Sequence, residues 1–282
     1  MLKRTLVSVA LLVIGLPVIF YGGIVFGVVF AVVLGLAAYE FARLFQAGGY
    51  QPSLVLTVVG VLALALARAL GGFAGSDWLI SLLVLAAMTY HLWAYERGGD
   101  QAATDFAITL AGVLYVGWLG AYMISLRLMP DGIWWFLIVL PAVWLADSGA
   151  YLVGSRIGRH KMVPRLSPKK SWEGYIGGIV FAVVGAALLA LLFQFVGGPL
   201  SSVIPWIAAP TAAVTPGAAA VLGLILGVLT LLGDLGESMI KRQVGQKDSG
   251  NLLPGHGGVF DRIDSWLWAG VIGYYLILWW FI

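Results

Sequence analysis

The chain has 282 residues, of which 61% are hydrophobic and only 10% are charged, and its formal net charge is +3. Its mean hydropathy of +0.98 is typical of a polytopic membrane protein. A soluble domain of this length needs a charged surface that this composition cannot supply. The sequence contains no cysteine, which excludes disulfides, thiolate nucleophiles and cysteine-based metal sites.

Apolar runs divide the chain into membrane spans, and we predict an all-α polytopic membrane protein with about nine transmembrane helices of about 20 residues each. The predicted spans are 5–20, 23–42, 53–70, 78–95, 106–126, 132–154, 174–196, 217–240 and 264–282. The first run follows Lys3 and Arg4, as in a signal peptide. No small-residue cleavage site follows it, so we expect a retained helix. The proline-rich segment 200–216 is expected to be an interfacial loop.

The placement of Lys and Arg predicts the orientation, because cytoplasmic loops are enriched in these residues. With the N-terminus in the cytosol, alternating spans put only Arg68 and Arg127, of the 16 Lys and Arg residues, on the outer side. We therefore expect a cytosolic N-terminus and a C-terminus on the outer side of a bacterial-type cytoplasmic membrane. The charged loops 155–173 and 241–263 then both face the cytosol, where nucleotides are found.

The domain organisation is expected to be simple, since neither a repeat nor a soluble domain stands out in the sequence. We predict a single integral membrane domain, with N-terminal transmembrane helices over 1–130. The C-terminal transmembrane catalytic region would occupy 131–282 and include both charged loops.

The segment 233–264 concentrates charge in an otherwise apolar sequence. Asp234, Ser238 and Lys241 follow one another at intervals of four and three residues, so they share one face of a helix. A carboxylate at Asp234 would lie inside the apolar slab, where it needs a proton or a cation. The structural alternative is an Asp–Lys network that only holds helices together.

Asp261 and Asp264 open the last predicted span. Either residue could cap that helix and complement its dipole. Capping does not explain why Asp234 converges on the same predicted membrane face. Carboxylate oxygens are the ligands that Mg²⁺ uses in proteins, and we favour Asp234 and Asp261 as metal ligands.

A basic, glycine-rich stretch lies between these acids and includes Lys247, Asp248, His256, Gly257 and Gly258. Glycines let backbone amides approach an anion, and a lysine adds positive charge. The GxxxxGK[ST] pattern of a P-loop is absent. Taken alone, the glycine content would indicate only a flexible loop.

A second basic loop, 155–173, follows Asp147, which is expected inside the sixth span. The loop carries Arg156, Arg159, Lys161, Arg165, Lys169 and Lys170. The loop is either an anchor for anionic lipid or a phosphate clamp. Ser171 is expected to cap the next span.

Acidic helix ends and basic loops on one membrane face indicate metal-assisted phosphoryl or nucleotidyl transfer to a lipid. In such a reaction the protein positions groups and neutralises charge.

Residues 238–264 read SMIKRQVGQKDSGNLLPGHGGVFDRID. This segment resembles the signature of phosphatidate cytidylyltransferases, also called CDP-diacylglycerol synthases, without a departure from it. The stretch 167–174, SPKKSWEG, and the segment around Asp147 are also similar to that family. The resemblance is specific over roughly the C-terminal half of the chain, whereas the N-terminal half is similar only in being apolar.

The resemblance implies that CTP condenses with phosphatidic acid to give CDP-diacylglycerol and pyrophosphate, with Mg²⁺ as cofactor and a second cation as a further expectation. Asp234 and Asp261 would hold metal. Phosphates would be bound by Lys241, Arg242, Lys247 and Arg262. The pocket would be completed by Ser238, Asp248, His256, Gly257, Gly258 and Asp264, together with Lys169, Lys170 and Asp147. The expected partners are CTP, phosphatidic acid and membrane lipids but no nucleic acid, and a homodimer is left open.

Two other functions stay open at this point. A CTP-dependent lipid kinase of the polyprenol or dolichol type would transfer the γ-phosphoryl group instead. A transporter that relays protons through Asp147, Asp234 and Lys241 belongs to a different class. The charges cluster near one predicted face, and no inverted repeat is visible, which argues against transport.

Overall fold

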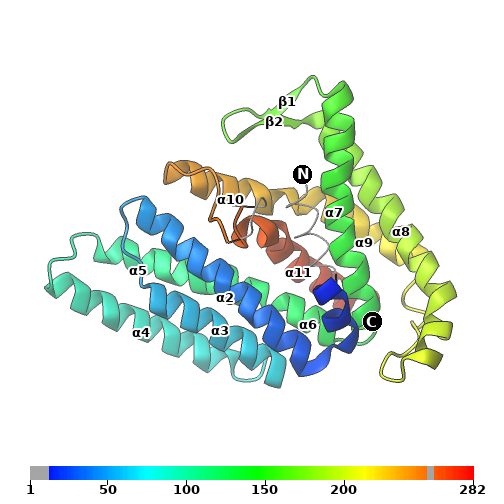
Figure 1. The fold of residues 1–282 in the computed structure, drawn as a ribbon, viewed down its shortest axis with the longest axis horizontal. Helices are drawn as coiled ribbons and strands as arrows, with labels where there is room; N and C mark the ends of the chain where they lie inside the picture. The colour runs from blue at the N-terminus through cyan, green and yellow to red at the C-terminus, as the bar shows by residue number, and fades with distance from the viewer. Residues whose placement is uncertain (1–12, 253–256) are drawn as a thin grey trace. The chain divides into compact units, whose positions relative to one another are not determined.

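The computed structural model describes residues 13–252 and 257–282 (Figure 1). Residues 13–21 are helical. The elements that follow are α2 (Gly23–Ala47), α3 (Leu54–Gly71), α4 (Ser76–Glu96), α5 (Ala102–Ala111), the π-helix η1 (Gly112–Trp118), α6 (Tyr122–Leu128), α7 (Gly132–Ile157), β1 (Lys161–Val163), β2 (Ser167–Ser171), α8 (Trp172–Val203), α9 (Pro216–Leu229), α10 (Leu231–Gln243) and α11 (Phe260–Trp280). The start of the first predicted span, up to residue 12, and His256 lie outside the described residues.

The prediction of an all-α polytopic membrane protein is confirmed. In the part of the chain that the structure describes, seven helical stretches are long and apolar enough to cross a membrane: α2, α3, α4, α5 through α6, α7, α8, and α9 with α10. Each coincides with a predicted span. Helix α11 matches the last predicted span but is not among the seven. Three of its first five residues are charged, and the helix is rich in Trp and Tyr. The total of about nine spans and the orientation stay predictions.

Contacts divide the chain into two compact units. Unit 1 comprises Met1–Ser125 and Met239–Leu267, and unit 2 comprises Leu126–Ser238 and Trp268–Ile282. The chain first passes from unit 1 to unit 2 after Ser125, a few residues before position 130, the predicted boundary between the N-terminal helices and the catalytic region. The charged segment 233–264 is divided, because Asp234 and Ser238 belong to unit 2 whereas the residues from Met239 onward belong to unit 1.

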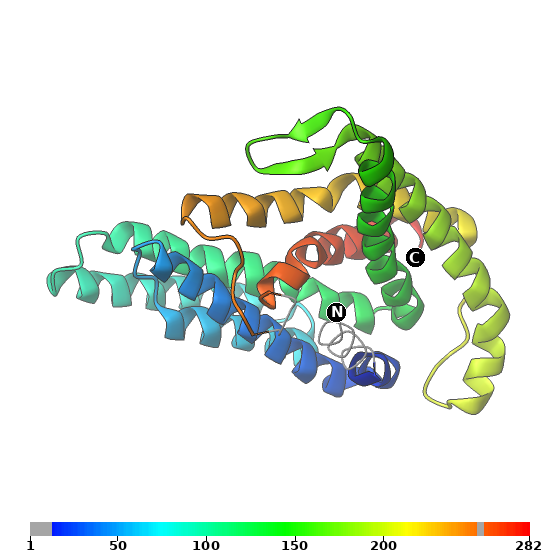
Figure 2. The same cartoon turned by 45° about the horizontal axis from the view of Figure 1, so that its top comes forward.

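Unit 1 is a bundle in which α2, α3, α4, α5 and η1 lie side by side (Figure 2). Small residues allow close contact: a side chain at Gly27 would overlap Ala69 of α3, and one at Gly112 would overlap Thr57. Aromatic side chains join the N-terminal helices to the start of α11, since Phe41 packs edge-on against Phe260 with ring centroids 5.6 Å apart. This packing brings α2 and the signature segment together.

Arg68 is buried in unit 1, with only 1% of its surface exposed. Its guanidinium lies over the ring of Phe73, 3.6 Å from the centroid, and also faces Trp118 and Tyr122. It donates a hydrogen bond to the Ser125 hydroxyl at 2.9 Å. A cation caged by aromatic rings inside a helix bundle stabilises the packing of these helices.

Unit 2 is built on α7, α8 and α9, which pack against one another. The helices approach closely because a side chain at Gly178 would overlap the Ala146 carbonyl, and one at Gly223 would overlap the Ala182 carbonyl. Helix α8 runs through the first residues of the segment expected to be an interfacial loop. The remainder, 204–215, has no helix or strand.

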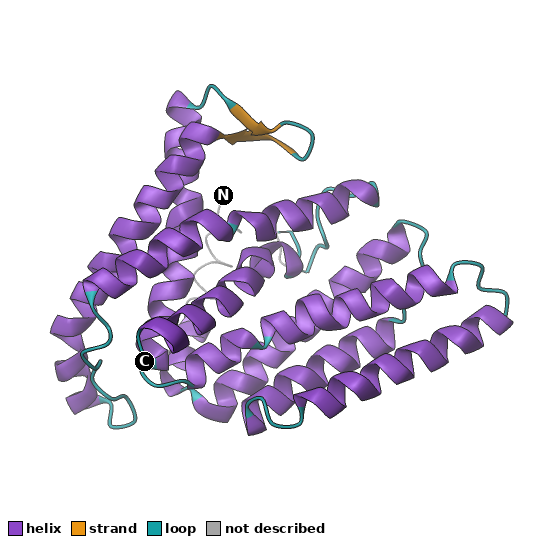
Figure 3. Ribbon diagram, turned by 180° about the vertical axis from the view of Figure 1, so that it is seen from behind, coloured by secondary structure: helices purple, strands orange, loops and turns teal. Residues whose placement is uncertain are grey.

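The loop expected at 155–173 contains a short antiparallel hairpin of β1 and β2, the strands coloured orange in Figure 3. Its base is fixed by Glu173, whose carboxyl accepts the backbone N–H of Arg159 at 3.1 Å and of His160 at 3.2 Å. The same carboxyl lies 2.5 Å from His160 Nδ1. Ser171 caps α8, as expected, by accepting the Gly174 N–H at 3.3 Å.

Candidate active site

The expected site residues fall in both units. Unit 1 holds Lys241, Arg242, Lys247, Asp248, Gly257, Gly258, Asp261, Arg262 and Asp264, and unit 2 holds Asp147, Lys169, Lys170, Asp234 and Ser238. His256 lies outside the described residues. Within each unit the structure brings a lysine to one of the two proposed metal-binding carboxyls.

In unit 1 the Asp261 carboxyl is the centre of a hydrogen-bond network. Its Oδ2 accepts the backbone N–H of Ser249 at 3.0 Å and of Gly258 at 2.8 Å. Its Oδ1 accepts the Lys241 ammonium at 2.7 Å, and the two side chains are only 8% and 13% exposed. Two backbone amides and a lysine therefore fix the orientation of this carboxyl.

These contacts bear on the alternative in which Asp261 only caps α11. The two amides that it accepts belong to residues that precede the helix, so the carboxyl ties the signature loop to the helix start. Asp264 is buried one turn later, and its Oδ1 accepts the neighbouring Ser265 N–H at 2.6 Å. Asp261 therefore organises a loop, which is more than helix capping requires.

A cavity of about 280 Å³ opens beside this network in unit 1. Its lining includes Lys247, Asp248, Ser249 and Gly250 from the signature segment and Arg43 from α2. The Lys247 and Asp248 side chains are exposed, as are Arg242 and Arg262. Basic side chains around a polar cavity suit a phosphate-bearing ligand.

In unit 2 Asp234 accepts hydrogen bonds from two side chains. Its Oδ2 pairs with the Lys170 ammonium at the end of the hairpin, and its Oδ1 accepts the Ser238 hydroxyl at 3.4 Å. The hairpin thus carries Lys170 to the carboxyl, whereas Lys169 is exposed on the same strand. Asp147 is exposed on α7.

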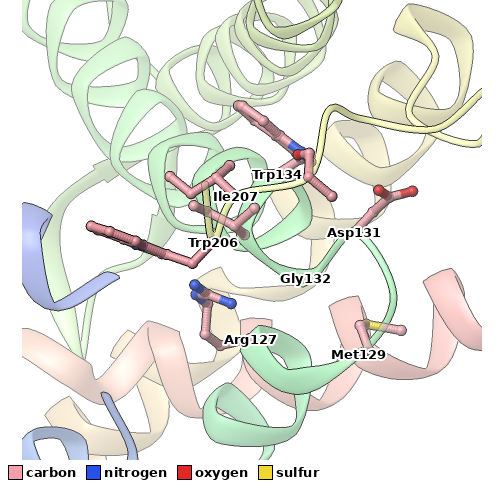
Figure 4. Close-up of a pocket in the computed structure, with 9 residues that line it drawn as sticks. Arg127, Met129, Asp131, Gly132, Trp134, Trp206 and Ile207 are labelled. Carbon is pink, nitrogen blue, oxygen red and sulfur yellow. The ribbon is translucent and has the colours of Figure 1, made fainter. Parts of the chain in front are cut away.

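A second cavity, of about 170 Å³, lies in unit 2 and contains none of the expected site residues (Figure 4). Arg127, at the end of α6, extends toward the irregular segment that carries Trp206 and Ile207. Asp131 at its rim accepts the Thr211 N–H at 3.2 Å and also the Thr211 hydroxyl. This cavity is therefore separate from the signature segment in both sequence and lining.

Glu40 was not among the expected residues, although it contacts the signature segment. It is 2% exposed, and its Oε2 accepts the Phe260 N–H at 2.8 Å. A signal was available, because Glu40 is the only charged residue in the predicted span 23–42. A lone acid in an apolar helix has a partner or a function.

Comparison with known proteins agrees with the resemblance of the signature. The sequence matches the Cytidylyltransferase family over residues 2–280. It is 34% identical over 273 residues to a phosphatidate cytidylyltransferase of Staphylococcus aureus (strain COL), covering 94% of this chain and 95% of that protein. A phosphatidate cytidylyltransferase of Staphylococcus haemolyticus is 33% identical over 271 residues, with the same coverage. One from Bacillus subtilis is 40% identical over 171 residues, or 60% of this chain and 57% of that protein. Because the similarity extends over nearly the whole sequence, helices and signature alike, the chain belongs to the cytidylyltransferase family.

Proposed function

We propose that this protein transfers the cytidylyl group of CTP to phosphatidic acid, giving CDP-diacylglycerol and pyrophosphate in phospholipid biosynthesis. The observation that carries the proposal is the Asp261 network, in which one signature segment supplies a carboxyl, a lysine and two backbone amides. The relatives named for this activity support the same assignment, since two of them match 94% of the chain.

Substrate phosphates would be bound by the basic residues of the signature segment, Lys241, Arg242, Lys247 and Arg262. Lys241 is anchored by Asp261, so its ammonium is already oriented before a ligand arrives. Lys247 lines the cavity of unit 1 and leaves its charge accessible. Fixed cations of this kind neutralise the charge that develops on a leaving pyrophosphate.

Asp234 and Asp261 would be the Mg²⁺ ligands, because carboxylate oxygens are the hard donors that Mg²⁺ uses. The ammonium of Lys170 or Lys241 contacts one oxygen of each carboxyl and would have to move aside for the ion. Bound Mg²⁺ would supply charge neutralisation on the triphosphate. The backbone amides on Oδ2 of Asp261 fix the direction in which its other oxygen points. A second cation beside Mg²⁺ is part of the proposal.

In the reaction, an oxygen of the phosphatidic acid phosphate forms a bond to the α-phosphorus of CTP. The bond from that phosphorus to the oxygen bridging to the β-phosphorus breaks, and pyrophosphate leaves with the electron pair. The attacking oxygen is already anionic, so a strong general base is not required. The chain's task is to position the two phosphates and offset their repulsion.

The protein is an integral membrane protein, and its bacterial relatives support a place in the cytoplasmic membrane. We propose that the signature segment faces the cytosol, where CTP is available, and that the acyl chains of the lipid stay in the bilayer. The basic hairpin would then attract the anionic headgroup.

Labelled CTP tests the proposal. Purified protein is incubated with vesicles that contain phosphatidic acid and a polyprenol, together with Mg²⁺ and CTP labelled at either the α- or the γ-phosphorus. We expect the α label to enter lipid and the γ label to leave as pyrophosphate. Entry of the γ label into lipid would identify a lipid kinase instead, and absence of any labelled lipid would reject both enzymatic assignments.

A further inference from the structure

Glu40 belongs to α2, far from the signature segment in sequence, but its carboxyl is buried against that segment in unit 1. Oε2 accepts the Phe260 N–H at 2.8 Å and the Ser249 hydroxyl at 3.4 Å. Within the described residues, Oε1 has no hydrogen-bond partner. The carboxyl therefore joins two parts of the signature segment that are about ten residues apart along the chain.

The backbone of the signature segment packs directly onto this carboxyl. A Cβ at Gly250 would overlap Oε1, and a Cβ at Gly258 would overlap Oε2 and the Ser249 hydroxyl. Only glycine leaves room for Glu40 at these two points. Two glycines and one buried acid thus form a single packed unit, which we call the Glu40 clamp: Glu40, Ser249, Gly250, Gly258 and Phe260.

The clamp is continuous with the Asp261 network through Ser249. The Ser249 hydroxyl, which donates to Glu40, also accepts the Asp261 N–H at 3.3 Å. The Ser249 backbone N–H donates to the Asp261 carboxyl at 3.0 Å. Gly258 likewise donates its N–H to Asp261 while packing against Glu40. Both amides that orient Asp261 therefore come from residues in contact with Glu40.

The clamp also shapes the cavity of unit 1. Ser249 and Gly250 form part of its wall, next to Lys247. Arg43 follows Glu40 by one helical turn on α2 and lines the same cavity. Helix α2 therefore contributes to this cavity in two ways, with one side chain in its lining and another that supports the wall.

We infer that Glu40 is a positioning residue for the signature segment, which it holds against α2 so that Asp261 faces Lys241 and the cavity keeps its wall. The inference rests on the proposed cytidylyl transfer. Glu40 acts through Ser249, Gly258 and Phe260, so it is not itself a catalytic residue. Partners of this kind typically contribute 10- to 100-fold to activity, because small displacements of reacting groups are costly.

The test compares two substitutions that fill the same space. Glu40→Gln keeps a carbonyl oxygen that can accept from Phe260 and Ser249. Glu40→Met has a similar length but accepts no hydrogen bond from them. Glu96→Gln, at an exposed carboxyl at the end of α4, is the matched control. We expect kcat for CDP-lipid formation to fall roughly 10- to 100-fold in E40M, and to stay near the control in E40Q.

Hydrogen exchange of the ligand-free protein in detergent supplies a second readout. In E40M, exchange should rise in 249–252 and 257–262 while protection of α3 and α5 is unchanged. Wild-type kcat in E40M, equal losses in E40M and E40Q, or loss of protection throughout unit 1 would each overturn the inference. If E40M does not accumulate in the membrane, Ser249→Ala replaces it in the test. Hydrogen exchange should then rise in 249–252 and 257–262, and wild-type kcat or loss of protection throughout unit 1 would overturn the inference.

The two readouts separate this inference from the proposed function. If the wild-type protein makes no CDP-lipid, the proposed function fails, and Glu40 loses its role in that reaction. The exchange comparison still decides whether Glu40 holds the signature segment. If the wild-type protein is active but E40M matches it, only the positioning role of Glu40 is wrong.

Discussion

The two aspartates proposed as metal ligands are supported in different ways. Asp261 in unit 1 accepts two backbone amides and a lysine, and 8% of its side chain is exposed. Asp234 in unit 2 accepts only side-chain donors among its described hydrogen bonds, Lys170 and Ser238, and 33% of its side chain is exposed. The Asp261 carboxyl is held by backbone amides of a loop, whereas the Asp234 carboxyl is contacted by side chains that can rotate away.

This difference predicts how each position tolerates substitution of the aspartate by asparagine. At Asp261 both oxygens accept from N–H donors, so an asparagine NH₂ group would face either a backbone amide or the Lys241 ammonium. At Asp234 an asparagine oxygen can face Lys170 while its NH₂ donates to the Ser238 hydroxyl, which can also accept. The same substitution is therefore mismatched at one site and accommodated at the other.

The largest effect is expected for Asp261→Asn. We expect kcat/KM to fall roughly 1,000-fold and the free energy of unfolding to fall by about 3 kcal/mol. The buried ion pair with Lys241 is lost, and the NH₂ group leaves either Lys241 or the two backbone amides without an acceptor. Activity is measured with labelled CTP and stability by thermal or denaturant unfolding in detergent. Normal stability in the variant would show that the Asp261 network is not a determinant of the fold.

Asp234→Asn should separate activity from stability. We expect kcat/KM to fall roughly 100-fold, since a charged oxygen donor becomes a neutral one. The unfolding midpoint should stay within error of wild type, because both hydrogen bonds can be rebuilt. A folded, inserted D234N protein with wild-type activity would remove Asp234 from the catalytic assignment. A large loss of stability would instead erase the contrast with Asp261.

The sequence correctly predicted features that depend only on residues close to one another along the chain. Long apolar runs predicted the helices, because a membrane span is a property of one contiguous segment. The helical period put Asp234, Ser238 and Lys241 on one face of what proves to be α10. Ser171 was expected as a cap because its side chain bonds only three residues ahead.

Features that depend on distant contacts could not be read in the same way. The hairpin strands are short, and β2, SPKKS, has neither alternating hydrophobicity nor β-branched residues. The clamp joins Glu40 to Ser249 and Phe260, more than 200 residues away, and no local pattern encodes that pairing. The single turn residue Thr230 between α9 and α10 was also not predicted, because the apolar run of α9 continues into Leu231 and Leu232.

Substitutions of Lys170 test whether its side-chain contact to Asp234 contributes to activity. Lys170→Met removes the ammonium but keeps much of the apolar stem, and we expect kcat/KM to fall roughly 10-fold, with Lys170→Arg recovering part of the loss. Steady-state rates at several salt concentrations provide the measurement. Equal losses in both variants would mean that the shape of this side chain matters more than its charge.

The smallest effect is expected at the base of the hairpin, where Glu173 holds the backbone that leads to the strands carrying Lys170. Glu173→Ala leaves the Arg159 and His160 amides without their acceptor, so the hairpin should sample other positions and kcat/KM should fall several-fold. His160→Ala removes only the ring and keeps the backbone hydrogen bonds, so its loss should be smaller. Combining Glu173→Ala with Lys170→Met should cost no more than Lys170→Met alone, because the first change acts through the second residue. Additive losses would show that the hairpin has a role of its own, independent of the contact between Lys170 and Asp234.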